Sequence, residues 1–145
     1  MDGRPSLEHY EESLNAVLDV IEKTYDQPLS LGRLSDIAQF SPFHFHRLFK
    51  AYTGETPNVY VRRLRLQKAL GMIERRSKKN LAEIAQQCGF AQSSDFTRAF
   101  LDVYGYPPVA SQSVYYLVKD SHETHFASFH ISRSYRYFIR RSEED

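Results

Sequence analysis

Residues 95–100 read DFTRAF, and residues 44–49 read HFHRLF. Both strings contain Phe-x-Arg-x-Phe, and the second copy lies 51 positions after the first. On a helix the two phenylalanines of each copy share one face, whereas the arginine between them points away from it. Each copy also follows an Ile-Ala-Gln triplet, at residues 37–39 and 84–86. The repeat therefore predicts two amphipathic helices that are anchored by phenylalanines and present an arginine.

Start and stop residues mark helices around both copies. Ser41-Pro42 combines a capping hydroxyl with a proline at the first helical position, and Thr53-Gly54 ends that helix near Tyr52. Thr56-Pro57 repeats the start signal before a long helical segment of about residues 57–75. Apolar spacing and caps predict further helices over about 7–25, 31–38, 80–87 and 93–105. Before residue 110 the chain has no convincing strand, which favours an all-α fold.

Each copy forms the second helix of a short helix, turn and helix arrangement. The turns are expected at Phe40-Ser41 and at Cys88-Gly89-Phe90. This order is that of a helix-turn-helix, whose second helix enters the major groove of DNA. At 1.5 Å per residue the helix between the two motifs spans roughly 28 Å. That length is of the order of the ~34 Å turn that separates two successive major-groove segments.

The outer stripes of the two second helices carry side chains that can read bases. The first stripe holds Phe43, His46, Arg47 and Lys50, and the second holds Ser93, Ser94, Thr97 and Arg98. Arginine suits this task because its guanidinium binds guanine O6 and N7 in a bidentate way. The cations of the middle helix are solvated or face phosphates: Arg62, Arg63, Arg65 and Lys68.

Charge is distributed unevenly along the 145 residues. Residues 1–29 carry two basic side chains against seven acids, whereas residues 30–108 carry twelve against six. The basic segment holds both motifs and suits a polyanion, because neutralised phosphates release counterions. No apolar run is long enough to span a membrane, and the single Cys88 excludes a disulfide framework. These features favour a cytoplasmic protein without a membrane partner.

From about Leu29 to Pro108 the chain resembles the DNA-binding domain of the AraC/XylS transcriptional regulators. The matching stretches are LSLGRLSDIAQFSPFHFHRLFKAYTGETPNVYVRRLRLQKA and LAEIAQQCGFAQSSDFTRAF followed by YGYPP. The second stretch is close to the signature region of the family, and the match covers about 80 residues.

The resemblance implies an all-α fold with two helix-turn-helix subdomains joined by a linker helix. The expected segments are an N-terminal helix within 1–29, a first motif at 30–55, the linker at 56–76, a second motif at 77–108 and a β-prone tail at 109–145. It also implies a transcription activator that binds double-stranded DNA as a monomer and contacts RNA polymerase. No enzymatic activity and no cofactor are expected.

The chain departs from the family pattern at Leu101-Asp102 and at Asp95, and Cys88 has a second possible interpretation. Leu101-Asp102 replaces the usual basic residue after Phe100, so the first motif is expected to bind DNA more strongly than the second. Asp95 stands where relatives are often uncharged, and it either accepts from cytosine N4 or caps the helix. Because some relatives are DNA-repair alkyl transferases with a reactive cysteine, Cys88 is an alternative nucleophile, although a buried packing role is favoured.

Residues 109–145 have a different character, with β-prone stretches at 114–118 and 125–139. They resemble the start of a truncated GyrI-like sensor domain, which makes a ligand-responsive regulator the main alternative. A small accessory hairpin or an irregular segment also fits. His122, His125 and His130 suggest a metal site, but few acids and no thiol lie close to them in the sequence, and histidines on β-prone sequence are more often surface residues. We therefore expect no metal.

Overall fold

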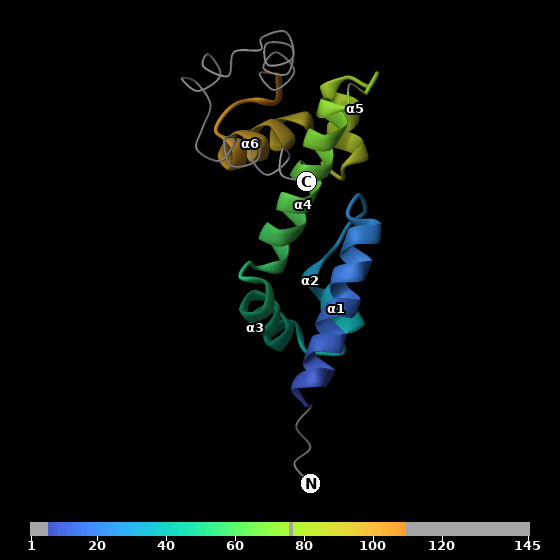
Figure 1. The fold of residues 1–145 in the computed structure, drawn as a ribbon, viewed down its shortest axis with the longest axis vertical. Helices are drawn as coiled ribbons and strands as arrows, with labels where there is room; N and C mark the ends of the chain where they lie inside the picture. Colours follow the sequence, from blue (N-terminus) through green and yellow to red (C-terminus); the bar gives the residue numbers. More distant parts are fainter. Residues whose placement is uncertain (1–5, 76, 110–145) are drawn as a thin grey trace, which may run out of the picture. The chain divides into compact units, whose positions relative to one another are not determined.

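The structure is a computed structural model that describes residues 6–75 and 77–109. Within these residues it contains six α-helices and no strand, as the sequence predicts. The helices are α1 (Leu7–Thr24), α2 (Leu31–Ala38), α3 (Pro42–Thr53), α4 (Pro57–Glu74), α5 (Leu81–Gln87) and α6 (Ser93–Tyr104) (Figure 1). The β-prone tail and its three histidines lie outside the described residues. None of the described helices combines the length and apolar character needed to cross a bilayer.

Local capping explains where most of these helices begin. The side chains of Ser6, Ser30 and Ser41 each accept a hydrogen bond from the backbone N–H three residues later. Asn80 does the same for α5, and Glu83 accepts from the Asn80 backbone N–H in return, which completes the predicted capping box. The starts of these helices are therefore encoded within three or four residues.

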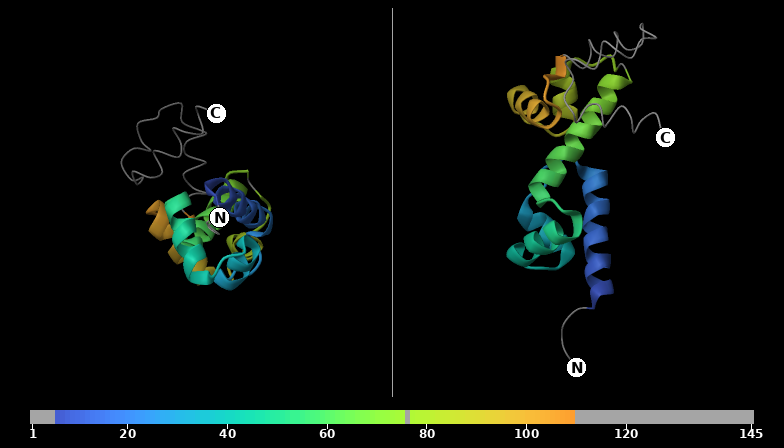
Figure 2. Two further views of the ribbon diagram at one scale, coloured as in Figure 1. Left: turned by 90° about the horizontal axis from the view of Figure 1, so that it is seen from below. Right: turned by 60° about the vertical axis from the view of Figure 1, so that its left-hand side comes forward.

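The chain forms two compact units, and the boundary falls inside α4 between Arg65 and Leu66. The first unit, residues 6–65, contains α1, α2, α3 and the first half of α4. In both figures α1, drawn in blue, runs beside α2, and these two helices are in contact (Figures 1 and 2). The core of this unit consists of Leu14, Val17, Ile21, Leu34, Ala38, Phe45, Phe49, Val61 and Leu64.

The second unit begins at Leu66 and contains the second half of α4 with α5 and α6, which contact each other. Its buried apolar side chains are Leu66, Ala69, Leu70, Ile73, Ile84, Ala85, Cys88, Phe96, Ala99, Phe100, Tyr104 and Tyr106. A continuous series of rings joins Phe90, Phe96, Phe100 and Tyr104, with centroids 4.6–5.7 Å apart. Each unit therefore has a core of its own that includes buried aromatic rings.

The turns of the two helix-turn-helix motifs differ in length. In the first turn Phe40 N–H donates to Ser35 O over 3.1 Å, and in the second Phe90 N–H donates to Ala85 O over 3.0 Å. Both bonds are the long bond of a Schellman motif, so Phe40 and Phe90 are equivalent, 50 positions apart. The Phe-x-Arg-x-Phe strings are 51 apart, so the second turn holds one extra residue.

Each Ile-Ala-Gln triplet lies at the helix and turn that precede the Phe-x-Arg-x-Phe helix, as the sequence predicts, but the two triplets are not equivalent in register. In the register of the two turns, Ile84 corresponds to Leu34, and both side chains are buried. Ile37 lies three positions later on α2 and is only half-buried. The residue in the left-handed region is Gln39 in the first turn, at φ 61°, and Gly89 in the second, at φ 95°.

Candidate nucleic-acid interface

Helix α3 presents the predicted residues on the side opposite its core contacts. Phe45 and Phe49 are completely buried, and their ring centroids lie 5.6 Å apart. Gly54, at φ 82°, ends the helix with its N–H bound to Lys50 O. The first outer face consists of four side chains, of which His46 is half-buried and the others are exposed: Phe43, His46, Arg47 and Lys50.

Phe43 and Arg47 form a pair on this first outer face. The Phe43 side chain is 72% exposed, which is unusual for a large aromatic residue. The Arg47 guanidinium carbon lies 5.7 Å from the centroid of the Phe43 ring. A cation–π contact at this distance restricts the arginine without occupying all of its donors. Arg47 therefore keeps N–H groups available for a ligand.

The start of α3 is held by rings from three elements, a feature that the sequence analysis missed. Tyr10 of α1 stacks on Phe40 of the turn, with ring centroids 5.5 Å apart, and Phe40 meets His44 of α3 edge-on at 5.3 Å. His9 also contacts Phe40 at 6.4 Å. The sequence shows only that aromatic residues lie near the start of α1, in the turn and near the start of α3. It does not show which of these rings contact one another. Through this ring cluster α1 helps to orient α3.

Helix α6 repeats the arrangement with different side chains. Phe96 and Phe100 are buried. The second outer face consists of four exposed residues: Ser93, Ser94, Thr97 and Arg98. The N-cap residue Gln92 makes no side-chain cap bond, in contrast to the serine cap of α3. All eight predicted residues therefore lie on the outer sides of α3 and α6.

A shift of 51 positions matches the two outer faces residue by residue. Phe43 corresponds to Ser94, His46 to Thr97 and Arg47 to Arg98. Lys50 corresponds to Leu101, whose side chain is 46% exposed on the outside of α6. Each helix thus presents one arginine in the same place, and its neighbours differ in size and charge. Two faces of this kind can contact two different base sequences.

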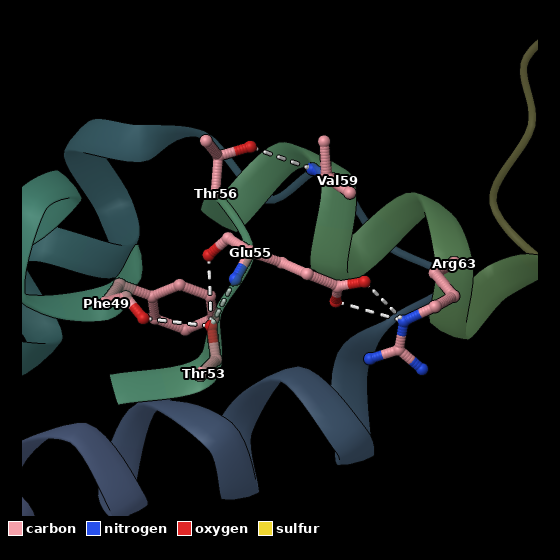
Figure 3. A network of polar contacts seen from close by, with 6 residues as sticks. All are labelled: Phe49, Thr53, Glu55, Thr56, Val59 and Arg63. Atoms are coloured by element: carbon pink, nitrogen blue, oxygen red, sulfur yellow. Dashed lines mark hydrogen bonds and ion pairs between the residues drawn. The ribbon is translucent and has the colours of Figure 1, made fainter. Parts of the chain in front are cut away.

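Two arginines of α4 bind other parts of the first unit. Figure 3 shows Arg63 Nε donating to both carboxylate oxygens of Glu55, at 2.9 and 3.0 Å, and the Glu55 N–H donating to Thr53 Oγ1. The Arg63 guanidinium also lies 5.1 Å from the Tyr60 ring centroid. These contacts stabilise the junction between α3 and α4. They engage Arg63 in the fold rather than leaving it solvated.

Arg65 stabilises the end of α1. Its Nε donates to Tyr25 O over 2.6 Å, and its Nη2 donates to Gln27 O over 2.8 Å. Partial burial lowers the pKa of Arg65, and the Asp26 carboxylate opposes this effect. Arginine remains protonated at neutral pH in spite of such a shift. The positive charge of Arg65 therefore interacts favourably with the carbonyl groups at the C-terminal end of α1.

The structure supports the packing role of Cys88. The side chain is completely buried at the end of α5, and its thiol contacts Met72 Sδ at 3.7 Å. A nucleophilic cysteine requires an accessible, stabilised thiolate, and burial in apolar surroundings disfavours one. Among the described residues no group of three histidine, cysteine or acidic side chains is placed to hold a metal ion.

Two helix-turn-helix units with matched outer faces define a class of DNA-binding regulators. A family profile described as a helix-turn-helix domain matches residues 34–113. The chain belongs to the AraC/XylS family of transcriptional regulators and contains the DNA-binding domain of that family.

Individual relatives agree with this assignment. A probable transcriptional regulator of Photobacterium leiognathi, LumQ, is 40% identical over 103 residues, which are 70% of this chain and 41% of LumQ. The transcriptional activator RhaS of Enterobacter sp. strain 638 is 31% identical over 102 residues, which are 70% of this chain and 36% of RhaS. The chain therefore spans less than half the length of these two relatives.

A solved structure shares the fold. The DNA-binding domain of the transcriptional factor AdpA, crystallised with a target DNA, superposes with a TM-score of 0.70. The match covers 74% of this chain and 96% of the AdpA domain, at 23% sequence identity. At this identity the likeness concerns the fold alone.

Proposed function

We propose that this protein is a sequence-specific transcription regulator that reads two successive major-groove segments, one with α3 and one with α6. The observation that carries the proposal is the match between the two outer faces, in which Arg47 and Arg98 occupy equivalent places opposite buried phenylalanines. A solvated arginine on one helix would be unremarkable. Two equivalent arginines, each on the second helix of a helix-turn-helix, favour base recognition.

The linker helix is proposed to set the spacing of the two contacts. An 18-residue helix such as α4 is roughly 27 Å long at 1.5 Å per residue. This length is of the order of the ~34 Å that separates successive major-groove segments on one side of B-DNA. Because one chain supplies both recognition helices, the protein is proposed to bind as a monomer.

The direction of regulation is proposed from the relatives. RhaS is named as a transcriptional activator, and we infer the same role for this protein. Activation requires a contact with the transcription machinery, for which RNA polymerase is the expected partner. Such a role places the protein in the cytoplasm with its DNA.

Selection of bound sites from random duplexes tests the proposal. The selected sites should contain two short conserved blocks whose centres lie about 10 base pairs apart, one for each recognition helix. Binding to the best site should weaken steeply as salt is raised, because phosphate contacts release counterions. Selection of a single block, or an affinity that barely responds to salt, would contradict the two-helix proposal.

A further inference from the structure

Glu55 holds the turn between α3 and α4 through both its backbone and its side chain. The Glu55 N–H donates to Thr53 Oγ1 over 3.2 Å, and Thr53 Oγ1 in turn donates to Phe49 O over 2.9 Å. The two carboxylate oxygens of Glu55 accept from Arg63 Nε at 2.9 and 3.0 Å (Figure 3). Glu55 therefore joins the last turn of α3 to the second turn of α4.

Two aromatic rings complete this connection. The Arg63 guanidinium carbon lies 5.1 Å from the centroid of the Tyr60 ring. Tyr60 meets the buried Phe49 ring edge-on, with centroids 5.4 Å apart. Contacts thus lead from α3 through the turn into α4 and back to α3. We call this set the coupling network, and it consists of Phe49, Thr53, Glu55, Tyr60 and Arg63.

The ion pair in the coupling network contributes little to folding stability. The side chains of Arg63 and Glu55 are 35% and 29% exposed. Ion pairs with access to water gain little free energy, because solvent screens their charges. The completely buried rings of Phe45 and Phe49 anchor α3 much more strongly. Stability alone is therefore a weak account of an ion pair that joins two helices at their connection.

The angle between α3 and α4 matters because α3 is long in comparison with one base pair. Helix α3 has 12 residues and is roughly 18 Å long at 1.5 Å per residue. A rotation of about 10° at the turn would move the start of α3, next to Phe43, by about 3 Å. Successive base pairs lie ~3.4 Å apart along the duplex. A small change in this angle would therefore shift the first outer face by nearly one base pair.

Only the first recognition helix is joined directly to the linker within the described residues. Three residues, 54–56, connect the end of α3 to the start of α4, whereas α5 and its turn lie between α4 and α6 in the chain. A restraint at residues 54–56 thus acts on α3 and the linker together. The coupling network lies at this connection.

We propose that Glu55 and Arg63 are positioning residues for base recognition, because they restrict α3 on the linker helix and make the protein selective for one spacing of its half-sites. This inference rests on the proposed reading of DNA by both α3 and α6. Core packing sets the mean orientation of α3, and the ion pair restricts departures from it. The two residues act through the first outer face, which carries Arg47.

The experiment measures the spacing preference of matched variants. One duplex carries the two selected blocks at the selected spacing, and two others have one base pair inserted or removed between the blocks. The preference is the ratio of the Kd for an altered duplex to the Kd for the selected one. Glu55→Ala removes the acceptor for Arg63 Nε. Glu55→Gln is the control, because it loses the same charge but keeps an amide oxygen that can accept.

The wild-type chain should bind the altered duplexes about 5- to 150-fold more weakly, because one set of base contacts is misaligned. Glu55→Ala should lower this ratio by about 1.5- to 5-fold, which is the range that a solvent-accessible ion pair contributes. Glu55→Gln should keep the wild-type ratio. Both variants lose a negative charge and should therefore bind all three duplexes somewhat more tightly.

A double-mutant cycle tests whether the two residues act together. Arg63→Gln should lower the spacing preference by a factor similar to that of Glu55→Ala. The double variant should lower it no further, because both changes remove one interaction. Base preference within the first block should stay at the wild-type level in every variant, since Arg47 is unchanged.

The spacing preference is the decisive readout, because partial unfolding weakens binding to all three duplexes by one factor and leaves their ratio unchanged. If Glu55→Ala keeps the wild-type ratio, or if Glu55→Gln lowers it equally, the ion pair does not position α3, although DNA binding stands. If the wild-type chain binds the three duplexes equally, the proposed two-helix function fails, and this inference fails with it.

Discussion

Replacement of Arg47 by alanine should remove one base contact from the first half-site without unfolding the protein. Arg47 is exposed, and its guanidinium carbon lies 5.7 Å from the centroid of the Phe43 ring. The contact with this ring contributes about 0.5–1 kcal/mol at an exposed site. The free energy of unfolding should therefore change by no more than that amount.

The effect on DNA binding should be larger and specific to sequence. A bidentate arginine–guanine contact discriminates by about 1–3 kcal/mol. Since 1.4 kcal/mol is tenfold in Kd, Arg47→Ala should weaken binding to the best site by about 5- to 150-fold. Substitution of each base pair in turn should show that the preference is lost at one position of the first block. Arg98→Ala should give the same result in the second block, about one helical turn away.

Lys50→Ala is the matched comparison, because Lys50 lies one turn further along the same helix and is also exposed. A phosphate contact carries no base information, so this variant should weaken all duplexes alike and reduce the salt slope by about one. Titrations at four or more salt concentrations separate the two behaviours. If Arg47→Ala keeps the full base preference and only the salt slope changes, Arg47 binds phosphate and the assignment of the reading residues is wrong.

Three further predictions concern the fold that holds these helices. Phe45→Ala removes a completely buried ring and should destabilise the first unit by about 3–5 kcal/mol in chemical denaturation. The backbone amides of α3 should also lose protection from hydrogen exchange. Intact protection in α3 would contradict the role of Phe45 as an anchor. Gln39→Gly should stabilise the chain by about 1 kcal/mol, because Gln39 adopts φ 61°, and an unchanged midpoint would argue against strain in this turn. Burial raises the pKa of Glu74 from its ordinary value of 4.5, and Arg75 partly opposes this shift. The fold therefore favours the protonated carboxyl, and stability should fall as pH rises through the range between the unfolded and folded pKa values. Glu74→Gln should melt at a higher temperature than the wild type at pH 7 and at the same temperature below about pH 4, and an equal difference at both pH values would refute this account.

The candidate site could be predicted from sequence to an unusual extent, because its residues lie on regular helices. Once Phe45 and Phe49 are assigned to the core, the 3.6-residue period places Arg47 on the outside of α3, and the same reasoning places Arg98 on α6. The role of the α4 cations could not be predicted in this way. Arg63 binds Glu55 eight residues away, and Arg65 binds Tyr25 O across 40 residues. No local pattern contains those partners.

The sequence by itself determined the elements of this protein, because helix starts, stops and faces depend on residues only a few positions apart. Ser6, Ser30, Ser41 and Asn80 cap their helices within three residues, and Gly54 ends α3 through its own backbone freedom. Tertiary packing decided which residues of each helix are buried. The buried residues of α4 in the first unit, Val61 and Leu64, do not continue as one stripe into those of the second, so helical spacing alone could not identify its core positions.

The turns and the ring cluster were also decided by tertiary structure. The one-residue difference between the two turns became visible only from the bonds of Phe40 and Phe90, because the repeated Ile-Ala-Gln triplets suggest another register. The stacking of Tyr10 on Phe40 joins residues 30 positions apart and orients the start of α3. The physical reason is the same in each case. Local sequence sets the conformation of a segment, whereas burial selects which of its residues meet distant partners.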